Sequence, residues 1–138
     1  MARPPLIPLR THEDARGKLV SIEGLRDLPF EIARVYYILG SEGAPRGFHA
    51  HKSLQQLMVS VHGSCRVVLD DGCHRSEYRL DRPDEGLFVG SMTWREMHDF
   101  SDGSVLLVLA SAPFDEQDYV RDYEQFLREV EAGGRHEG

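Results

Sequence analysis

The sequence predicts an all-β fold, a small barrel or sandwich with one short C-terminal helix. Short runs rich in β-forming residues recur along the chain with turn residues between them, and only the tail carries apolar residues at helical spacing. The 138 residues suffice for one domain with a buried core, so we expect a single domain over 1–138. Small barrels of this kind hold one ligand in the mouth.

Seven segments carry the expected strands, in the order GKLVSIE (17–23), IARVYYILG (32–40), QLMVSVHG (56–63), SCRVVLDDG (64–72), CHRSEYRL (73–80), a pair within 85–100 divided near Gly90, and SVLLVLAS (104–111). The Asp71-Gly72 dipeptide is a hairpin signal between two of them. The run 104–111 is continuously apolar, which predicts a strand covered on both faces.

The tail from about Asp115 to Ala132 has a helical pattern, since apolar residues recur at three- and four-residue spacing: Tyr119, Tyr123, Phe126, Leu127 and Val130. The last residues, GGRHEG (133–138), are expected to fray. The only cysteines, Cys65 and Cys73, flank a tight turn, and we expect them to remain unbridged.

The net charge of −7 argues against nucleic acid or an anionic membrane as the main partner. No apolar run approaches the roughly 18 residues of a membrane helix. The N-terminal MARPPLIPLR has neither an apolar export segment nor a cleavage signature, so we expect a cytoplasmic protein. An anionic small molecule is still an acceptable ligand if arginines gather locally.

The stretch RGFHAHK (46–52) carries the first chemical signal. His49 and His51 are two residues apart, so in a strand they face the same side. The spacing fits the first cupin motif: Gly43, five residues, His49, Ala50, His51, four residues, Gln56, six residues and Gly63. That motif has Glu where this chain has Gln56, and a further His on a later strand, at the position that best matches Arg95.

The changed residues argue against a metal site. A divalent cation prefers imidazole and carboxylate ligands, whereas a guanidinium carries a permanent positive charge. We therefore expect neither a metal nor another cofactor. His98 is an alternative third ligand, but alternation places it on the opposite face from Arg95.

Two functions of the histidine pair are open from the residues alone. One is a structural role in which the pair is held by hydrogen bonds, and the other is proton transfer. Arg46 precedes the pair, Arg95 is expected in the same pocket, and Tyr37 and Trp94 are expected nearby. Cationic neighbours disfavour imidazolium and would keep a histidine neutral near pH 7, as a general base requires.

The chain resembles the cupin sugar 3,4-ketoisomerases that act on dTDP-4-keto-6-deoxyglucose. The matching stretches run along almost the whole chain: DARGKLVSIE (14–23), LPFEIARVYYILG (28–40), PRGFHAHKSLQQ (45–56), GSCRVVLDDG (63–72), GLFVGSMTWREMHDFS (86–101), LLVLAS (106–111) and FDEQDYVRDYEQF (114–126). The combination of PRGFHAHK, W-x-EMHDFS and DE-x-DY-x-RDY makes the resemblance specific.

The resemblance implies a cupin jelly-roll barrel that works without metal, as a homodimer whose N-terminal strands (about 1–25) are exchanged. It implies a dTDP-linked 4-keto-6-deoxy sugar as substrate, used in deoxyamino-sugar biosynthesis, whose carbonyl moves from C4 to C3 through an enediol.

On the matching positions the resemblance implies a role for each candidate residue. His49 and His51 would transfer the protons, and Tyr37 would be a hydroxyl relay. Arg46 and Arg95 would lie near the sugar or the pyrophosphate.

Further candidates for substrate binding are Arg16, Arg34 and Arg66, for each of which a surface salt bridge is the alternative. Trp94 would form an apolar wall against the sugar or the base, with a place in the core as its alternative. The resemblance also links the positions of Arg16 and Arg95 to the configuration at C4. Arginine at both is a mixed signature, which we read as favouring the gluco product.

Three other functions are compatible with such a barrel. A sugar 3,5-epimerase would use the same nucleotide sugar and a histidine base, but would leave the carbonyl in place. A non-catalytic sugar-binding cupin would bind without proton exchange. A metal-dependent cupin oxygenase is opposed by Gln56 and Arg95.

Overall fold

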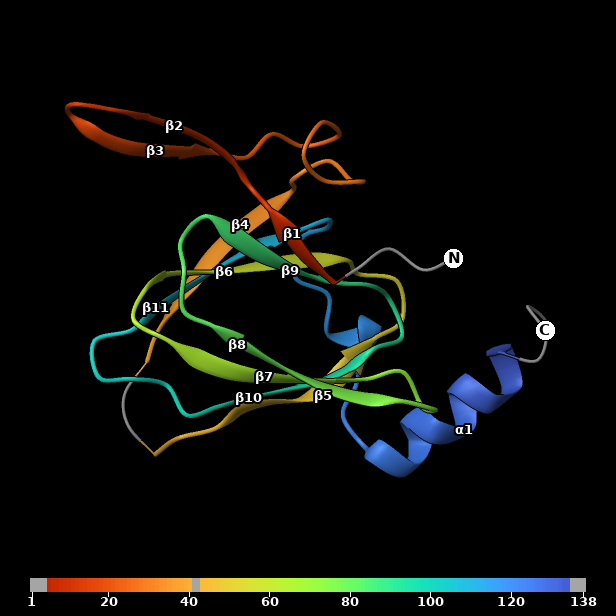
Figure 1. Ribbon diagram of the computed structural model, residues 1–138. Helices are drawn as coiled ribbons and strands as arrows, with labels where there is room; N and C mark the ends of the chain where they lie inside the picture. The colour runs from red at the N-terminus through yellow and green to blue at the C-terminus, as the bar shows by residue number, and fades with distance from the viewer. Residues whose placement is uncertain (1–4, 41–42, 135–138) are drawn as a thin grey trace.

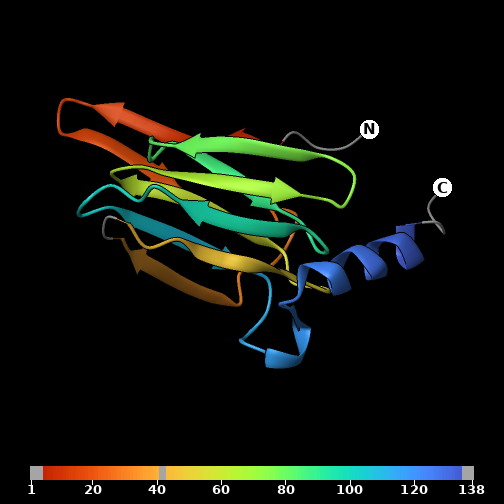
Figure 2. The same cartoon turned by 90° about the horizontal axis from the view of Figure 1, so that it is seen from below.

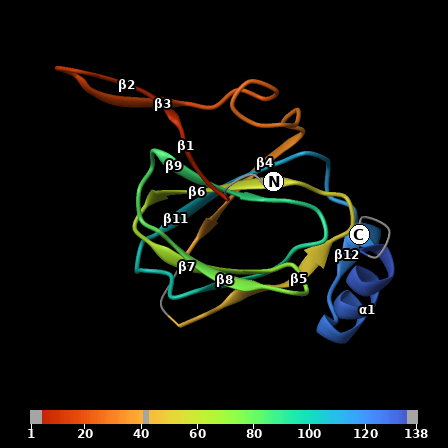
Figure 3. The same ribbon diagram turned by 45° about the vertical axis from the view of Figure 1, so that its right-hand side comes forward.

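Two five-stranded antiparallel sheets face one another in the computed structural model, which describes residues 5–40 and 43–134. The first sheet has the order β1 (Leu6–Pro8), β9 (Glu85–Val89), β6 (Gln56–His62), β11 (Val105–Ala110) and β4 (Arg34–Leu39). The second has the order β12 (Tyr119–Val120), β5 (Arg46–His51), β10 (Trp94–His98), β7 (Cys65–Asp70) and β8 (Arg75–Leu80). Figures 1 and 3 show the two sheets as the layers of a flattened barrel.

The main core fills the space between these sheets. Alternation along each strand directs one set of apolar side chains inward, and the buried set comprises Met58, Cys65, Val67, Leu69, Leu80, Leu87, Val89, Met97, Phe100, Leu106 and Val108. This apolar packing occupies one part of the barrel interior. Several inward positions of β4, β5 and β10 carry polar side chains instead, and they form the site described below.

The N-terminal segment covers the outer face of the first sheet. Leu9, Leu28 and Phe30 pack there against Leu57 of β6 and Leu109 of β11, so both strands are buried on both faces. This confirms the expectation for the apolar run 104–111. Strands β2 (Arg10–Asp14) and β3 (Gly17–Ser21) pair with each other and, within 5–40 and 43–134, with no other strand, and they form a hairpin that projects from the barrel (Figure 1).

The C-terminal helix is shorter than expected. Helix α1 spans Tyr123–Gly134, and Asp122 caps it because its Oδ1 accepts a hydrogen bond from Glu124 N at 3.0 Å. The preceding residues form a short 3₁₀ helix, η1 (Glu116–Asp118), and strand β12, whose Tyr119 lies opposite His51 of β5. The expected helix start at about Asp115 is therefore wrong, because pairing with β5 outweighs the local helical pattern.

Helix α1 packs on the outside of the barrel beside β5 and β12 (Figure 2). Its apolar face closes a third buried cluster, which contains Ala50, Trp94, Val120 and Phe126. Gly133 and Gly134 belong to this helix, whereas the rest of the tail expected to fray lies outside the described residues.

The other expected strands are confirmed. The β7–β8 hairpin turns at Asp71–His74, as the Asp71-Gly72 signal predicts, and Gly90 divides β9 from β10. Strands β1 and β2 lack an alternating pattern and form through pairing with β9 and β3. Cys65 and Cys73 are both free thiols. Across residues 5–40 and 43–134, no helix has the length and apolar character needed to cross a bilayer.

Candidate active site

A local distortion of β5 places the histidine pair. Gly47 and Phe48 both have positive φ angles, 93° and 60°, and the pairing of β5 with β10 shifts register next to Arg95. A Cβ on Gly47 would lie 2.9 Å from the carbonyl oxygen of Arg95, so this close approach requires glycine. After the bulge, Ala50 faces α1, while His49 and His51 face the barrel interior.

The two imidazoles lie edge to face, with ring centroids 5.0 Å apart. Tyr119 of β12 covers both, its ring centroid 4.3 Å from that of His51 and 4.9 Å from that of His49. His51 is only 2% exposed, whereas His49 is half-buried. The Nδ1 of His49 lies 3.0 Å from the carbonyl oxygen of Gly47. Because a carbonyl only accepts, Nδ1 carries the proton and the lone pair of His49 is on Nε2.

A buried polar network lies beside the pair. Arg95 is fully buried on β10 and donates to the Thr93 carbonyl oxygen at 3.1 and 3.3 Å and to Oε1 of Gln56. Gln56 in turn donates from Nε2 to the Tyr36 hydroxyl at 2.9 Å. Burial lowers the pKa of Arg95 to about 10, which leaves it cationic at neutral pH. Among the described residues no carboxylate forms an ion pair with Arg95.

This environment keeps both histidines neutral. Burial first, and the positive charge of Arg95 second, lower the pKa of His49 to about 4. The same two causes lower the pKa of His51 to about 3, against the opposing effect of Asp118. At pH 7 both imidazoles are therefore unprotonated on one nitrogen, the state in which they accept a proton.

The site opens into a cavity of about 530 Å³ between β4 and β5. His49 lies in its wall with Tyr36 and Tyr119, and two cationic side chains, Arg34 and Arg46, line it as well. The Arg34 guanidinium lies over the Tyr36 ring at 5.1 Å. The interior of this acidic protein thus presents a locally positive concave surface, the arrangement that suits an anionic small molecule.

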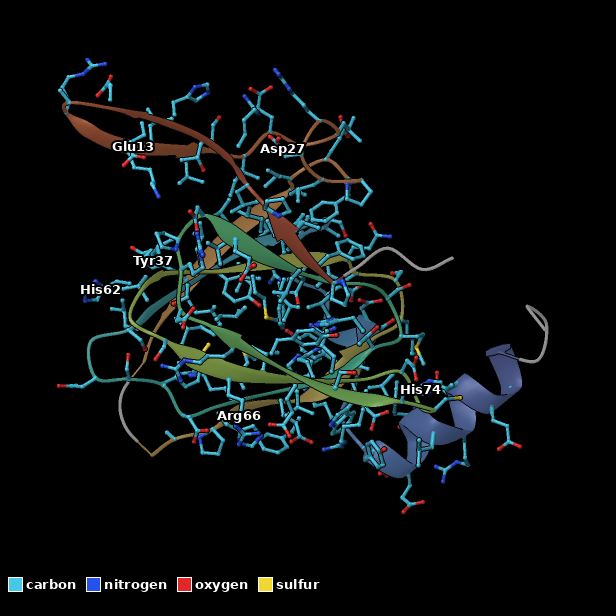
Figure 4. The ribbon with its side chains drawn as sticks, in the orientation of Figure 1. Glu13, Asp27, Tyr37, His62, Arg66 and His74 are labelled. Carbon is cyan, nitrogen blue, oxygen red and sulfur yellow. The ribbon has the colours of Figure 1, made fainter. Side chains whose placement is uncertain are left out.

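Tyr37 does not lie where the relay was expected. Successive residues of β4 point to opposite faces, and it is Tyr36 that reaches the Gln56–Arg95 network. Tyr37 is 61% exposed and points outward at the edge of the cavity (Figure 4). The structure thus brings the neighbouring tyrosine to the histidine pair.

Three further candidates lie away from the cavity. Trp94 faces outward from β10 and is buried under α1, where its ring contacts Tyr123 and Phe126, so its place is in the core. Arg66 faces outward from β7 and binds Asp99 and Glu77 (Figure 4).

Arg16 is in the turn of the β2–β3 hairpin, with its side chain 91% exposed and paired with Asp14. Within this chain, Arg16 and Arg66 therefore both form surface salt bridges, which was the alternative to substrate binding.

The residues at the site do not fit a divalent cation. His49, His51 and Gln56 converge there, but Oε1 of Gln56 already accepts a hydrogen bond from Arg95, whose charge would repel a metal ion. His98 faces the opposite side of β10, where it contacts Glu96 and Phe48, as alternation predicted.

Sequence reasoning missed four participants: Tyr36, Gln56 as a hydrogen-bond partner of Arg95, Asp118 and Tyr119. The last two belong to DEQDY (115–119), a stretch that the resemblance had singled out without assigning it a role. The Nδ1 of His51 lies 3.3 Å from Oδ2 of Asp118.

Comparison with known proteins agrees with this geometry. Residues 3–131 match the family described as "FdtA: WxcM-like, C-terminal". The chain is 53% identical over 118 residues, 85% of its own length and 85% of the relative's, to the TDP-4-oxo-6-deoxy-alpha-D-glucose-3,4-oxoisomerase of Aneurinibacillus thermoaerophilus. The chain belongs to this FdtA family.

Solved structures of 3,4-ketoisomerases superpose closely on the FdtA-family barrel described here. One, from Helicobacter canadensis, has 46% identity and a TM-score of 0.88, covering 91% of this chain and 96% of that one. Another is a mutant of QdtA from Thermoanaerobacterium thermosaccharolyticum in complex with TDP-4-keto-6-deoxyglucose. It has 40% identity and a TM-score of 0.89, covering 93% and 94% of the two chains.

The sugar epimerases are more distant from this FdtA-family chain. The RmlC epimerase of Mycobacterium tuberculosis has 21% identity and a TM-score of 0.72, covering 83% of this chain and 66% of that one. At this identity the likeness concerns the fold alone, and it confirms the predicted cupin jelly roll.

Proposed function

We propose that the protein is a cytoplasmic, metal-independent isomerase that moves the keto group of dTDP-4-keto-6-deoxyglucose from C4 to C3. The observation that carries the proposal is a neutral histidine, His49, in the wall of a cation-lined cavity, near Arg95, which is buried and forms no ion pair with a carboxylate among the described residues. The relatives described above, a 3,4-oxoisomerase and 3,4-ketoisomerases, support this choice of reaction.

The reaction begins with proton removal at C3. His49 takes the proton at Nε2, the C–H electron pair forms the C3=C4 double bond, and negative charge develops on the C4 oxygen. The second half reverses the pattern. The C4 oxygen takes up a proton, the hydroxyl at C3 loses its proton as its carbonyl forms, and C4 receives a proton. No atom is gained or lost, so the histidine pair and a hydroxyl group suffice for the whole sequence.

Arg95 provides the electrostatic part of catalysis. A buried guanidinium with no carboxylate partner among the described residues creates a positive potential at the site, and its strength is greatest where water is excluded. The negative charge that develops on the enediolate would balance the positive charge of the Arg95 guanidinium. Because the guanidinium keeps its protons, the Tyr36 hydroxyl and the histidines are the groups that exchange them.

Arg34 and Arg46 are our candidates for binding the pyrophosphate. Both line the cavity, and a guanidinium pairs with two phosphate oxygens at once. Arg34 is also fixed in place, since it lies between the rings of Tyr36 and Phe114 at 5.1 and 5.8 Å.

The proposal includes a homodimer. The outer face of β4 exposes Val35, Tyr37 and Leu39, and the β2–β3 hairpin pairs with no other strand among the described residues of its own chain. A second copy would cover this apolar face, and exchanged N-terminal segments would bring the Arg16 hairpin turn to the other copy's site. Light scattering that gives the mass of one chain would contradict this part.

The test is proton and carbon NMR of the protein with dTDP-4-keto-6-deoxyglucose in deuterated water containing EDTA. We expect a new C3 carbonyl with deuterium at C4, and a coupling constant at C4 that reports the gluco configuration. Exchange at C3 and C5 with the carbonyl still at C4 would establish an epimerase instead. An unchanged substrate that binds would establish a binding protein, and activity that needs an added metal would overturn the metal-free mechanism.

A variant pair assigns the base. We expect His49→Asn to lose isomerisation by at least about 10²-fold, the usual contribution of a general base, while binding of TDP is retained. His62→Asn, on an exposed position at the end of β6, is the matched control and should leave the rate unchanged.

A further inference from the structure

Asp118 is a charged group at the site to which the reaction scheme above gives no role. It ends η1, immediately before Tyr119, and its Oδ2 lies 3.3 Å from Nδ1 of His51. The side chain of His51 is almost completely buried, and this Nδ1 has no other hydrogen-bond partner among the described residues. At this separation the contact is an ion-pair approach that does not meet the criteria of a formed hydrogen bond.

The position of Asp118 is held independently of His51. Its Oδ1 accepts hydrogen bonds from the Ser53 amide and the Ser53 hydroxyl, both at 2.9 Å, and its Oδ2 accepts one from the Leu54 amide at 3.2 Å. The Lys52 amide donates to the Asp118 main-chain carbonyl oxygen at 2.9 Å. Although burial opposes it, these hydrogen bonds hold the pKa of the Asp118 carboxyl below its usual range, so the group is ionised.

A fixed carboxylate determines which nitrogen of His51 carries the proton. If Nδ1 presented its lone pair to Oδ2, two electron-rich atoms would face each other in a buried place. If Nδ1 carries the proton, the contact is attractive. From this geometry we infer that Asp118 is a positioning residue that holds His51 in the Nδ1–H tautomer and leaves Nε2 free to accept a proton.

The ring of Tyr119 also helps to hold His51 in this orientation. The Tyr119 ring lies over both imidazoles, and the Arg121 guanidinium covers that ring, with its central carbon 4.1 Å from the ring centroid. The segment DEQDYVR (115–121) therefore contacts His51 at two places, with the Asp118 carboxylate at the edge of the imidazole and the Tyr119 ring on its face. His49 has the same tautomer, held by the Gly47 carbonyl, so both members of the pair present the same nitrogen for proton transfer.

The tautomer can be measured without substrate. Nitrogen-15 NMR of the imidazole rings, assigned with the His51→Asn variant, distinguishes a protonated from an unprotonated Nδ1. We expect a protonated Nδ1 and an unprotonated Nε2 for His51 in the wild-type protein, and a loss of this preference in Asp118→Asn. A wild-type His51 protonated on Nε2 would overturn the inference, even if Asp118→Asn failed to fold.

The kinetic consequence rests on the ketoisomerase activity proposed above. We expect Asp118→Asn to lower kcat by about 10- to 100-fold with KM changed less than about twofold, since the effect is on proton transfer and not on binding. Asp115→Asn is the matched control. It removes one negative charge from the same segment and keeps an N-cap for η1, so it should change neither the tautomer nor kcat. Equal losses in both variants would show a merely structural effect.

Discussion

The depressed pKa of His49 predicts an unusual acid limit for the reaction. An ordinary histidine titrates near pH 6.5, but burial and the charge of Arg95 lower the pKa of His49 to about 4. Lowering the pH is therefore the informative perturbation. The charged groups facing His49 are Arg95 from β10, Arg121 and Glu116 from the C-terminal segment, and His51 from its own strand when that residue is protonated. Burial and the two arginines outweigh Glu116 and the Gly47 carbonyl.

The size of the effect follows from these two pKa values. At pH 5.5 a histidine with a pKa of about 4 is about 97% neutral, whereas one with a pKa of 6.5 is about 9% neutral. We expect kcat/KM at pH 5.5 to remain within about 10% of its value at pH 7.5, because this parameter reports the free enzyme. An unperturbed base would lose about tenfold over the same interval.

The assay follows initial rates by NMR or by a coupled enzyme from pH 4.5 to 8, with circular dichroism at each pH to verify that the protein is folded. An inflection in kcat/KM near pH 6.5 in folded protein would refute the reasoning. It would mean that the guanidinium of Arg95 does not act on His49, or that a solvated group is the base.

Four further predictions concern the same network and the core. The folded-state pKa of His51, about 3, lies below its unfolded value, so its contribution to the free energy of unfolding should be fully present above about pH 6.5. As the pH drops below this value, the free energy of unfolding should fall by about 1.4 kcal/mol per pH unit for this group, which denaturant unfolding at several pH values would show. Tyr36→Phe should lower kcat by tenfold or more and Tyr37→Phe by less than about twofold, and equal effects would contradict the assignment of the inward tyrosine. Arg95→His should change the product ratio or the rate, read by NMR, and an unaltered product at an unaltered rate would remove Arg95 from the mechanism. Phe126→Ala should cost about 3–5 kcal/mol of stability by thermal or denaturant unfolding, since this α1 side chain is fully buried and its ring contacts Trp94 of β10.

Local patterns predicted most of the strands and the orientation of the histidine pair. Alternation with period two is a property of the strand itself, so residues such as His49 and His51 share a face wherever the strand lies. The same rule separated Arg95 from His98 correctly, and the charge of Arg95 argued against a metal site before any geometry was known. The net charge left an anionic small molecule acceptable as a ligand on the condition that arginines gather locally, and Arg34 and Arg46 line the cavity.

For the other strands, only the tertiary structure shows which residues face the barrel interior and which face outward. Tyr36 and Tyr37 are chemically equal in the sequence, and the register of β4 with β11 determines which one faces inward, since Tyr36 lies opposite Val108 of the inner core. Trp94 was expected near a sugar, but the outer face of β10 is covered by α1, which begins almost thirty residues later in the chain. A pattern within one strand carries no information about which element covers each face.

By itself the sequence predicted a fold of short strands with one C-terminal helix, a common face for His49 and His51, and an arginine in place of a metal ligand, because these depend on residue type and near-neighbour spacing. Only the tertiary structure brought Asp118 and Tyr119 to His51. Asp118 is held there by hydrogen bonds from Ser53 and Leu54, which precede it by 65 and 64 positions in the chain. Their own segment has a helical pattern, and the loss of that helix is compensated by pairing with β5 and by burial against the imidazoles. Contacts at such separation depend on the closed barrel as a whole, and no local rule contains them.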